Sequence, residues 1–193
     1  MPAKSKIFET VKNTILKYNM IRPGDRIIAA VSGGPDSICL VDLLAGLSKT
    51  MDITLVAAHY EHGLRPEEDT FETDLVKETA SSLNIPFETE KASGLTPLSS
   101  SLEEKARELR YDFLERTRIK YNAHKIAMGH NLNDQAETVL MRLLRGSGMT
   151  GLSGIPPVRD NKIIRPLIET GREDIIDYLE ARGLEYATDS SNR

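Results

Sequence analysis

The chain has 193 residues and a formal net charge of −4, and it contains a single cysteine and no tryptophan. This length is enough for one domain with a sizeable core, which must be mostly aliphatic because aromatic residues make up only 5%. One cysteine, Cys39, excludes an intrachain disulfide, a zinc ribbon and a four-cysteine iron–sulfur site. No long apolar stretch follows the first residues, so we expect a cytoplasmic protein without a signal peptide or a membrane span.

Apolar periodicity along the chain predicts helices and strands in alternation. Helices are expected at residues 5–19, 36–48, 67–83, 101–121, 132–145 and 171–182. Strands are expected at residues 26–31, 53–59, 86–91, 125–128 and 162–168. Residues 93–101 are rich in Gly, Ser and Pro and should form a mobile loop, after which Ser101 and Glu104 make a capping box. The alternation predicts an α/β fold of three layers, with helices on both faces of a parallel sheet.

The most informative segment follows the first expected strand and reads Ser-Gly-Gly-Pro-Asp-Ser at residues 32–37. Its two glycines allow positive φ and a close approach to a ligand, and Pro35 fits the first turn of a helix. The N–H groups at that helix start favour an anion, and the two serine hydroxyls add donors. Asp36 would repel a bare phosphate but suits one that carries Mg²⁺. The turn therefore predicts a site for a metal-bound polyphosphate.

In a parallel sheet, ligands bind beyond the carboxyl ends of the strands. Three segments follow strands and should meet along that edge, at residues 32–37, 59–65 and 129–134. At the end of the last segment and one turn beyond it, Asp134 and Glu137 share one helix face near the positive end of the helix dipole, where both carboxylates stay ionised. Such a pair suits an ammonium group or a metal. The alternative is that Asn133 or Asp134 caps the helix and that Glu137 is solvated.

Two further groups of residues are candidates for contact with phosphate. Arg107 and Arg110 lie one turn apart on an expected helix and can clamp a phosphate or a nucleotide, unless they pair with neighbouring glutamates on the surface. Residues 146–151 spell a literal G-x-G-x-x-G, but they follow a helix rather than a strand, so they do not predict a dinucleotide site. We expect a flexible loop there, with Arg145 facing phosphate.

Six motifs occur in the order found in one known family. They are the turn at 32–37, His-x-x-His-Gly-Leu-Arg, Ala-Arg-x-x-Arg-Tyr, Gly-His-x-x-x-Asp-x-x-Glu-Thr-Val-Leu, Leu-Leu-Arg-Gly-Ser-Gly and Gly-Leu-x-Gly-Ile-Pro-Pro. The turn resembles the PP-loop of the N-type ATP pyrophosphatases, which cleave ATP between its α- and β-phosphates. It is not a Walker A loop, because no Gly-Lys-Ser/Thr follows it. From about residue 24 onwards, the chain resembles the N-terminal catalytic domain of the bacterial tRNA(Ile)-lysidine synthetase family.

The resemblance implies a Rossmann-like fold of the adenine nucleotide alpha hydrolase type and a ligase that forms a carbon–nitrogen bond. The family adenylates C2 of the wobble cytidine of tRNA(Ile) with a CAU anticodon, and L-lysine then displaces AMP to give lysidine. ATP and Mg²⁺ would be the cofactors. Relatives continue into tRNA-recognising domains, so residues 1–193 are expected to be a catalytic domain truncated before them. The oligomeric state stays open, with a homodimer among the options.

Roles carried over from the resemblance follow the motifs. The groups that hold pyrophosphate and Mg²⁺ would be Ser32, Gly33, Gly34, Asp36 (the metal ligand) and Ser37. The adenosine would be bordered by Ala30 and His59. The α-phosphate or the flipped cytidine would be contacted by Arg107 and Arg110. The lysine pocket would be formed by His130, Asp134 and Glu137. The segments near the adenylate would contribute Gly129, Arg145, Ser147 and Gly148.

Three other functions remain open. A tRNA thiolase of the same superfamily would typically use paired cysteines or a bound cluster. A small-molecule amidating ligase would share the 32–37 turn but not the later motifs. A nucleotide-binding regulatory module without turnover would have no need of Asp36, Arg110 or Glu137.

Overall fold

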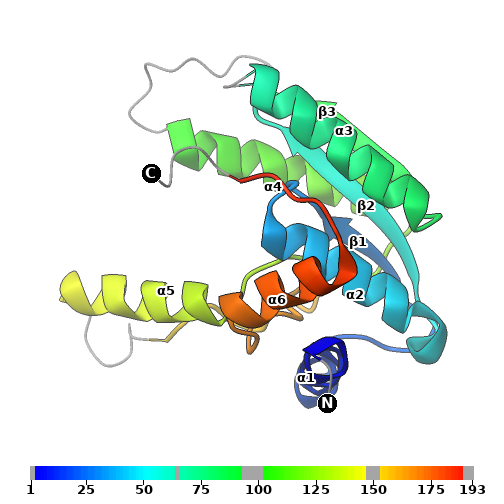
Figure 1. Ribbon diagram of the computed structural model, residues 1–193. Coiled ribbons are helices and arrows are strands. Elements are labelled where there is room, and N and C mark those ends of the chain that lie inside the picture. The colour runs from blue at the N-terminus through cyan, green and yellow to red at the C-terminus, as the bar shows by residue number, and fades with distance from the viewer. Residues whose placement is uncertain (1–2, 64–65, 93–101, 147–152, 189–193) are drawn as a thin grey trace.

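The computed structural model describes residues 3–63, 66–92, 102–146 and 153–188, and it shows an α/β fold built on one six-stranded sheet (Figure 1). The strands are β1 (Arg26–Ala30), β2 (Thr54–Glu61), β3 (Phe87–Lys91), β4 (Lys125–Ala127), β5 (Val158–Arg159) and β6 (Ile163–Ile164). Their order across the sheet is β3-β2-β1-β4-β6-β5, and every pairing is parallel except that of β5 with β6. The predicted fold class is confirmed.

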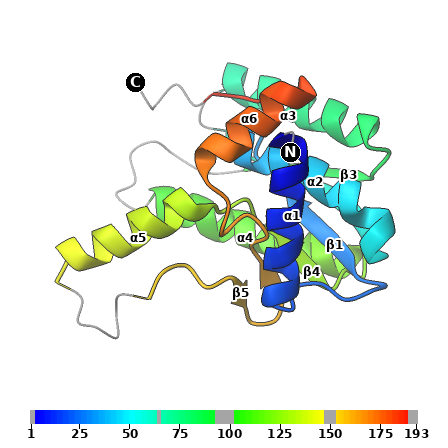
Figure 2. The same ribbon diagram turned by 60° about the horizontal axis from the view of Figure 1, so that its bottom comes forward.

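Helices cover both faces of this sheet. They are α1 (Ala3–Lys17), α2 (Pro35–Met51), α3 (Pro66–Ser82), α4 (Leu102–Lys120), α5 (Leu132–Leu144) and α6 (Arg172–Arg182). One face packs against α2, around which α1, α3 and α6 are arranged, and the other face packs against α4 (Figures 1 and 2). No helix in the described ranges is long and apolar enough to cross a membrane.

The central strands are buried on both faces, as parallel strands between two helical layers must be. In β1, Ile27 and Ala29 pack into the cluster around α2, whereas Ile28 packs into the cluster that includes Phe113 and Leu114 of α4. Successive side chains of a strand point to opposite faces, so a continuous apolar run is what this position requires. The core is mostly aliphatic, as the composition predicts.

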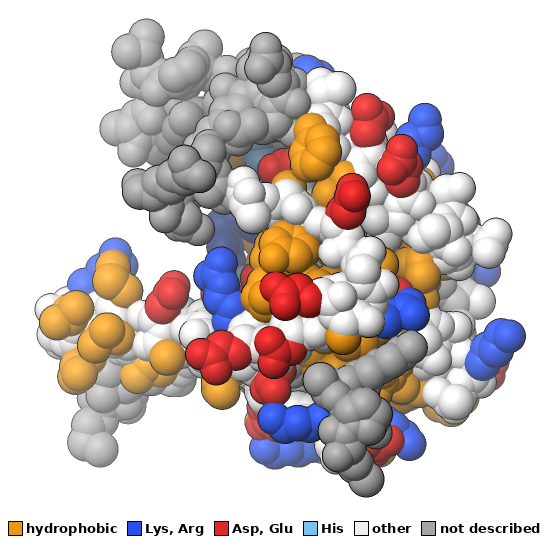
Figure 3. Space-filling model, in the orientation of Figure 1, with side chains coloured by type: hydrophobic (Ala, Val, Ile, Leu, Met, Phe, Trp, Pro, Cys, Tyr) orange, Lys and Arg blue, Asp and Glu red, His pale blue; other side chains and the backbone are white. Residues whose placement is uncertain are grey.

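Helix α5 differs from the others because none of its residues is buried, and it extends away from the sheet (Figures 1 and 2). Figure 3 shows apolar side chains gathered on this arm. The exposed large apolar residues of α5 are Leu132, Val139, Leu140, Met141, Leu143 and Leu144. Only its first turn therefore belongs to the compact part of the domain.

The prediction of one strand at 162–168 is wrong in its bounds and length. The chain makes a hairpin in which the two-residue strands β5 and β6 flank Asp160 (φ 53°) and Asn161 (φ 51°). Positive φ at both central positions is the geometry of a type I′ turn, which matches the twist of paired strands. Pro166 lacks an N–H group and cannot extend the ladder, so the strand ends early.

The remaining predicted elements are found, each with bounds within three residues of the expected ones. Shifts of this size arise at element ends, where hydrogen bonding is incomplete. The loop expected at 93–101 and the capping box that begins at Ser101 lie outside the described residues.

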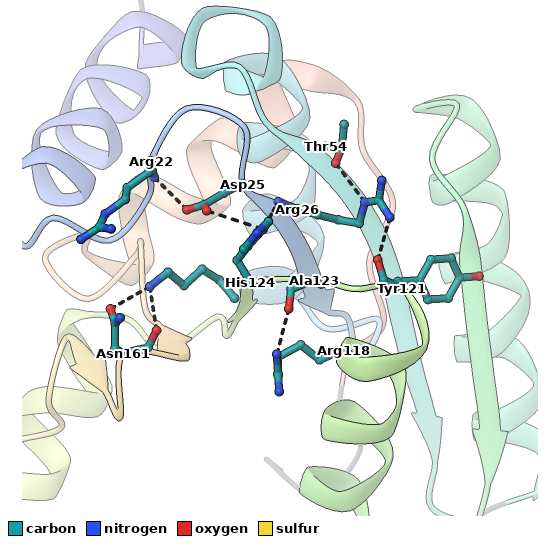
Figure 4. A network of polar contacts seen from close by, with 10 residues as sticks. Arg22, Asp25, Arg26, Thr54, Arg118, Tyr121, Ala123, His124 and Asn161 are labelled. Carbon is teal, nitrogen blue, oxygen red and sulfur yellow. Dashed lines mark hydrogen bonds and ion pairs between the residues drawn. The ribbon is translucent and has the colours of Figure 1, made fainter.

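A polar network ties the strands together at their amino ends, on the edge opposite the predicted site (Figure 4). His124 Nδ1 accepts the N–H of Arg26 at 3.0 Å, and Asp25 accepts the N–H of Arg22 at 2.8 Å. The buried ammonium of Lys125 donates to both oxygens of Asn161, at 2.6 and 2.8 Å. These bonds join β1, β4 and the hairpin turn, and they give this edge a structural role.

A second buried network fastens α6 to α2. The Asp42 carboxylate accepts the hydroxyl of Tyr178 and also pairs with the Arg182 guanidinium at 2.9 Å. Asp42 is 4% exposed and Tyr178 is fully buried, so both groups depend on these partners for the hydrogen bonds that water would otherwise supply.

Replacement of this carboxylate tests its role. Asp42→Ala should lower the free energy of unfolding by about 2–4 kcal/mol, because it leaves a phenol and a guanidinium without their buried acceptor. Urea denaturation followed by circular dichroism measures the change. The control is Lys6→Ala, which breaks the exposed pair with Asp174 and should leave the urea midpoint almost unchanged. Equal losses in the two variants would contradict this account.

Candidate functional site

The turn between β1 and α2 has the backbone geometry that its glycines predict. Gly33 has φ +95°, a conformation that side chains other than glycine rarely adopt. Gly34 is the N-cap of α2 and Pro35 is the first helical residue, with no side-chain hydrogen bond capping the helix. Pro35 has no N–H and the Ser37 N–H donates to the Gly34 carbonyl at 3.1 Å, so Asp36 carries the first N–H of α2 that can face an anion.

Hydrogen bonds hold the turn in this form. Ser37 Oγ accepts the N–H of Ser32 at 3.1 Å and donates to the Gly34 carbonyl at 2.9 Å. The Gly33 carbonyl accepts the N–H of Ala187 at 2.9 Å. The C=O and N–H of a trans peptide point in opposite directions, so this bond turns the Gly34 N–H away from Ala187. The Gly34 nitrogen lies 3.4 Å from Ser32 Oγ, to which it donates.

Close packing around the turn also demands glycine at two positions. A Cβ on Gly129, just after β4, would lie 3.2 Å from backbone atoms of Asp36, which cannot move without shifting the start of α2. A Cβ on Gly33 would lie 3.3 Å from Cβ of Glu72 on α3. The turn is thus held between β4 on one side and α3 on the other.

A cavity of about 210 Å³ opens beside the turn at the carboxyl edge of the sheet. Its floor is apolar, with Ala30, Ala58 and Met128 among the lining residues. Polar groups line the same space and come from the turn, from the ends of β2 and β4, and from helices α3 and α4: Ser32, Asp36, His62, His130, Glu72 and Arg110. An apolar floor with a few convergent polar groups is typical of a small-molecule site.

Asn131 joins the turn to α5. Its amide Nδ2 donates to Asp36 Oδ1 at 2.9 Å, while its Oδ1 accepts the N–H groups of Asn133 and Asp134 at 2.8 and 3.1 Å. The Asp134 carboxylate returns the bond by accepting the N–H of Asn131 at 2.9 Å, which completes a capping box. Sequence reasoning missed Asn131, although Asn-x-x-Asp before an apolar run is a recognisable cap.

Arginines gather on the other side of the cavity, around Tyr111. Arg107 and Arg159 lie over its ring, at 5.3 and 4.8 Å from the centroid, and Arg110 lines the cavity itself. Arg165, only 2% exposed, donates to His130 Nδ1 at 3.3 Å and to the Pro156 carbonyl. The sequence predicts Arg107 and Arg110 here but not Arg159 or Arg165. This concentration of positive charge suits a polyanionic ligand.

Comparison with known proteins agrees with this geometry. Residues 4–193 match the family model described as the PP-loop domain. The chain belongs to the PP-loop family. Among curated proteins, it is 43% identical over 189 residues to a tRNA(Ile)-lysidine synthase of Clostridium tetani and 44% identical over 195 residues to one of Clostridioides difficile. Each match covers 96% of this chain, and the chain spans about 40% of the length of these relatives.

Solved structures give the fold. A U34-tRNA thiolase of Methanococcus maripaludis aligns with a TM-score of 0.79 over 96% of this chain and 67% of its own, at 20% sequence identity. An NH3-dependent NAD synthetase of Campylobacter jejuni aligns with a TM-score of 0.57 over 93% of this chain and 73% of its own, at 15% identity. At these identities, the alignments establish the shared architecture alone.

The PP-loop residues fit a magnesium ion that takes most of its ligands from phosphate and water. Burial raises the pKa of Asp36 and the nearby Asp134 charge adds to the effect, and the Asn131 hydrogen bond and the Arg172 charge offset it only in part. A cation beside the Asp36 carboxylate would supply further positive charge. Among the described residues there is no cluster of three or more ligand side chains, and Mg²⁺ commonly binds through one or two carboxylates together with substrate phosphates.

The two predicted carboxylates of α5, those of Asp134 and Glu137, lie in different surroundings. Asp134 is half-buried and serves the cap, as the capping alternative predicts. Glu137 lies one turn further along, is exposed and bonds to no other residue that the structure describes. Neither lines the cavity, although α5 begins at its edge. A role for the pair in a lysine pocket therefore stays a prediction.

His59 lies beneath the PP-loop rather than in the cavity lining. It is 1% exposed, and its Nδ1–H donates to the carbonyl of Val31 at 2.9 Å. Tyr60 and His62, the next residues on either side of Glu61, line the cavity instead. We conclude that His59 supports the entry into the turn, and its predicted contact with adenosine stays untested.

The predicted loop after α5 is only partly described. Arg145 is the exposed C-cap of α5, about 20 Å along the helix from its first turn. It does not line the cavity. Ser147 and Gly148 lie outside the described residues.

Gly33→Ala tests the turn geometry. It should weaken ATP binding at least tenfold, because an Ala side chain at positive φ costs about 1–3 kcal/mol and pushes the loop away from Glu72. Isothermal titration with ATP and Mg²⁺ measures the effect. Gly24→Ala is the matched control: Gly24 has φ +84° at the far edge, and an added Cβ would meet no atom within 4 Å, so this variant carries similar strain without touching the site. Equal weakening in both variants would contradict a local role.

Stability should fall in mild acid. Burial lowers the pKa of His59, His62 and His130, in the last case from 6.5 to about 4. Below pH 6.5 the histidines of the unfolded chain bind protons, whereas the buried rings of the folded chain stay neutral. The free energy of unfolding therefore decreases as the pH falls from 6.5 towards the pKa of the folded state. Urea midpoints at about pH 7 and pH 5 measure the loss. His130→Gln should reduce the difference, and an unchanged difference would contradict burial of a neutral ring.

Proposed function

We propose that this chain is the adenylating domain of a tRNA(Ile)-lysidine synthetase. In the reaction, the C2 carbonyl oxygen of the wobble cytidine in tRNA(Ile) with a CAU anticodon attacks the α-phosphorus of ATP, and pyrophosphate leaves. The amine of L-lysine then attacks C2, loses its surplus proton, and AMP departs with the oxygen. The observation that carries the proposal is the identity of 43% and 44% to curated relatives of that name across 96% of the chain.

The leaving pyrophosphate is assigned to the PP-loop. The start of α2, with the positive end of its dipole and the N–H of Asp36, is in place before the charge develops, and such preorganised donors lower the barrier without further reorganisation. Asp36 is the proposed ligand of Mg²⁺, which would supply positive charge to the phosphates when bound. Asn131 fixes the orientation of that carboxylate through its 2.9 Å hydrogen bond.

The arginine side of the cavity is assigned to the α-phosphate and the cytidine. Arg110 lines the cavity, and its buried Nε has no partner among the described residues, which leaves a donor for an incoming acceptor. Burial lowers the pKa of Arg110, yet the group stays charged because an arginine begins from so high a value. Arg107 is exposed and lies nearer the rim, where it suits the RNA backbone.

The lysine side is assigned to the first two turns of α5. Since Asp134 is engaged in the capping box, the exposed Glu137 is the carboxylate with capacity to pair with an ammonium group and to take up its proton. This assignment separates the site into a cationic wall for the nucleotide and an acidic helix start for the amine.

The alternatives that the sequence leaves open have less support. Burial strongly raises the pKa of Cys39, the only cysteine, so this thiol is not a reactive thiolate of the kind that thiolases employ. The solved thiolase and NAD synthetase share the fold at 20% and 15% identity, well below the curated synthases. We also keep the prediction that tRNA-recognising domains complete the enzyme, since the matched segment is only 40% of the length of such a relative.

Product analysis tests the proposal. Incubated with ATP, Mg²⁺, a tRNA(Ile) transcript with a CAU anticodon and labelled lysine, the chain should release pyrophosphate and AMP and place the label on the RNA. A transcript with a UAU anticodon is the control and should give none of these products. Release that requires ammonia or a sulfur donor in place of lysine would contradict the proposal.

Two substitutions separate the steps. Asp36→Asn should reduce pyrophosphate release by more than about 100-fold, because it removes the charge that faces the metal-bound phosphates. Glu137→Gln should preserve tRNA-dependent pyrophosphate release and lower lysine transfer by about 100-fold, as expected when a general base is lost. Glu180→Gln, an exposed carboxylate of α6, is the control and should leave both steps unchanged. Full lysine transfer by Glu137→Gln would refute the assignment of the amine pocket.

A further inference from the structure

Two histidines at the carboxyl edge of the sheet are held in opposite tautomers. His59 Nδ1 lies 2.9 Å from the carbonyl oxygen of Val31, and a carbonyl can only accept. The proton of the neutral His59 ring must therefore be on Nδ1, which leaves Nε2 without one. His59 Nε2 is buried and has no partner among the described residues.

His130 shows the reverse arrangement. Its Nδ1 lies 3.3 Å from Nε of Arg165, and a guanidinium can only donate. His130 Nδ1 must therefore be the acceptor, and the single ring proton must be on Nε2. The guanidinium cannot turn away easily, because its Nη1 also donates to the Pro156 carbonyl at 2.6 Å.

The charges around His130 keep its ring neutral. Arg165, Arg107 and Arg110 all disfavour a second proton, and only Asp134 favours one. Burial acts in the same direction as the arginines and is the largest cause of a pKa of about 4. Among the described residues, Arg165 pairs with no carboxylate and interacts with the phenol of Tyr111, so its positive charge acts on the neighbouring imidazole.

We propose that Arg165 is a positioning residue that holds His130 as a neutral Nε2–H donor at the nucleotide cavity. The acceptor would be an anionic or carbonyl oxygen of the bound nucleotide or cytidine, since His130 lines that cavity together with Ser32 and Arg110. This assignment rests on the proposed function. It makes His130 a hydrogen-bond donor, so His130 is not the base that deprotonates the lysine amine. That task then falls to a carboxylate.

Long-range ¹H–¹⁵N correlation spectra of the imidazole rings test the assignment directly. The chain has four histidines, so substitution of each in turn assigns the spectrum. At neutral pH, His130 should show a protonated Nε2 and a bare Nδ1, while His59 shows the opposite and serves as an internal reference. His130 should keep this pattern down to about pH 5, since its pKa is about 4. An Nδ1–H tautomer, or protonation of His130 near the ordinary value of 6.5, would overturn the proposal.

Substitutions supply the second readout. Arg165→Lys keeps the charge but loses the planar donor, so it should mix the His130 tautomers and raise the pKa seen in the same spectra. Arg118→Lys is the control, because Arg118 also donates to a backbone carbonyl but forms its hydrogen bonds with Glu115 and Ala123, neither of which lines the cavity. Its spectrum should match that of the unmodified chain. Unchanged His130 tautomers in Arg165→Lys would contradict a positioning role.

Turnover by His130 variants completes the test. Gln retains an N–H close to the position of Nε2, so His130→Gln should keep pyrophosphate release within about tenfold of the unmodified chain, whereas His130→Ala should lose about 100-fold. Equal losses in both variants would contradict a donor role. The spectra need neither tRNA nor lysine, so failure of the tautomer assignment and failure of the proposed reaction are distinguished.

Discussion

The hydrogen bond from Asn131 to Asp36 is the contact on which the site depends. It joins the start of α2, beside the proposed phosphate site, to the start of α5, which carries the acidic residues. Asp36 belongs to the first turn of α2, beside the PP-loop. Asn131 caps α5 and orders Asp134 through reciprocal bonds. The close approach of Gly129 to the backbone of Asp36 allows the two helix starts to come this near. Phosphate donors and the acidic helix start are thereby held in one rigid unit.

Electrostatics divides the site into two sides. Arginines around Tyr111 and in the cavity wall have few described carboxylate partners, and the buried Arg165 has none among the described residues. On the other side, the mutual repulsion of Asp36 and Asp134 contributes to the raised pKa of Asp36. Partly compensated charge of both signs destabilises a folded chain, and a bound polyanion with its cation would relieve both. The residues whose charges lower the stability of the ligand-free domain are therefore the ones that would bind a ligand.

Much of this could be predicted from the sequence, for reasons that are local. The apolar run of β1 and the glycines of the PP-loop determine strand, turn and helix without reference to distant residues. The site edge followed from the rule that ligands bind at strand ends. Arg165 was missed because the strand was predicted to run from 162 to 168, which hid the fact that Arg165 directly follows the end of β6. His59 is predicted to border the adenosine because it lies near the end of a strand, but the sequence does not show that its ring donates to the Val31 carbonyl. Contacts such as Ala187 with Gly33 join residues far apart in sequence, and no local pattern contains them.

The central claim is that the triphosphate of ATP lies on the PP-loop over the end of β1, with its adenosine in the adjoining cavity. A crystal structure of the chain with Mg²⁺ and a non-hydrolysable ATP analogue measures this directly. The account predicts density for the β- and γ-phosphates against residues 32–37, metal density next to Asp36, and the base against Ala30 and Met128. Phosphate density at another edge of the sheet, or a base bound outside this cavity, would contradict it.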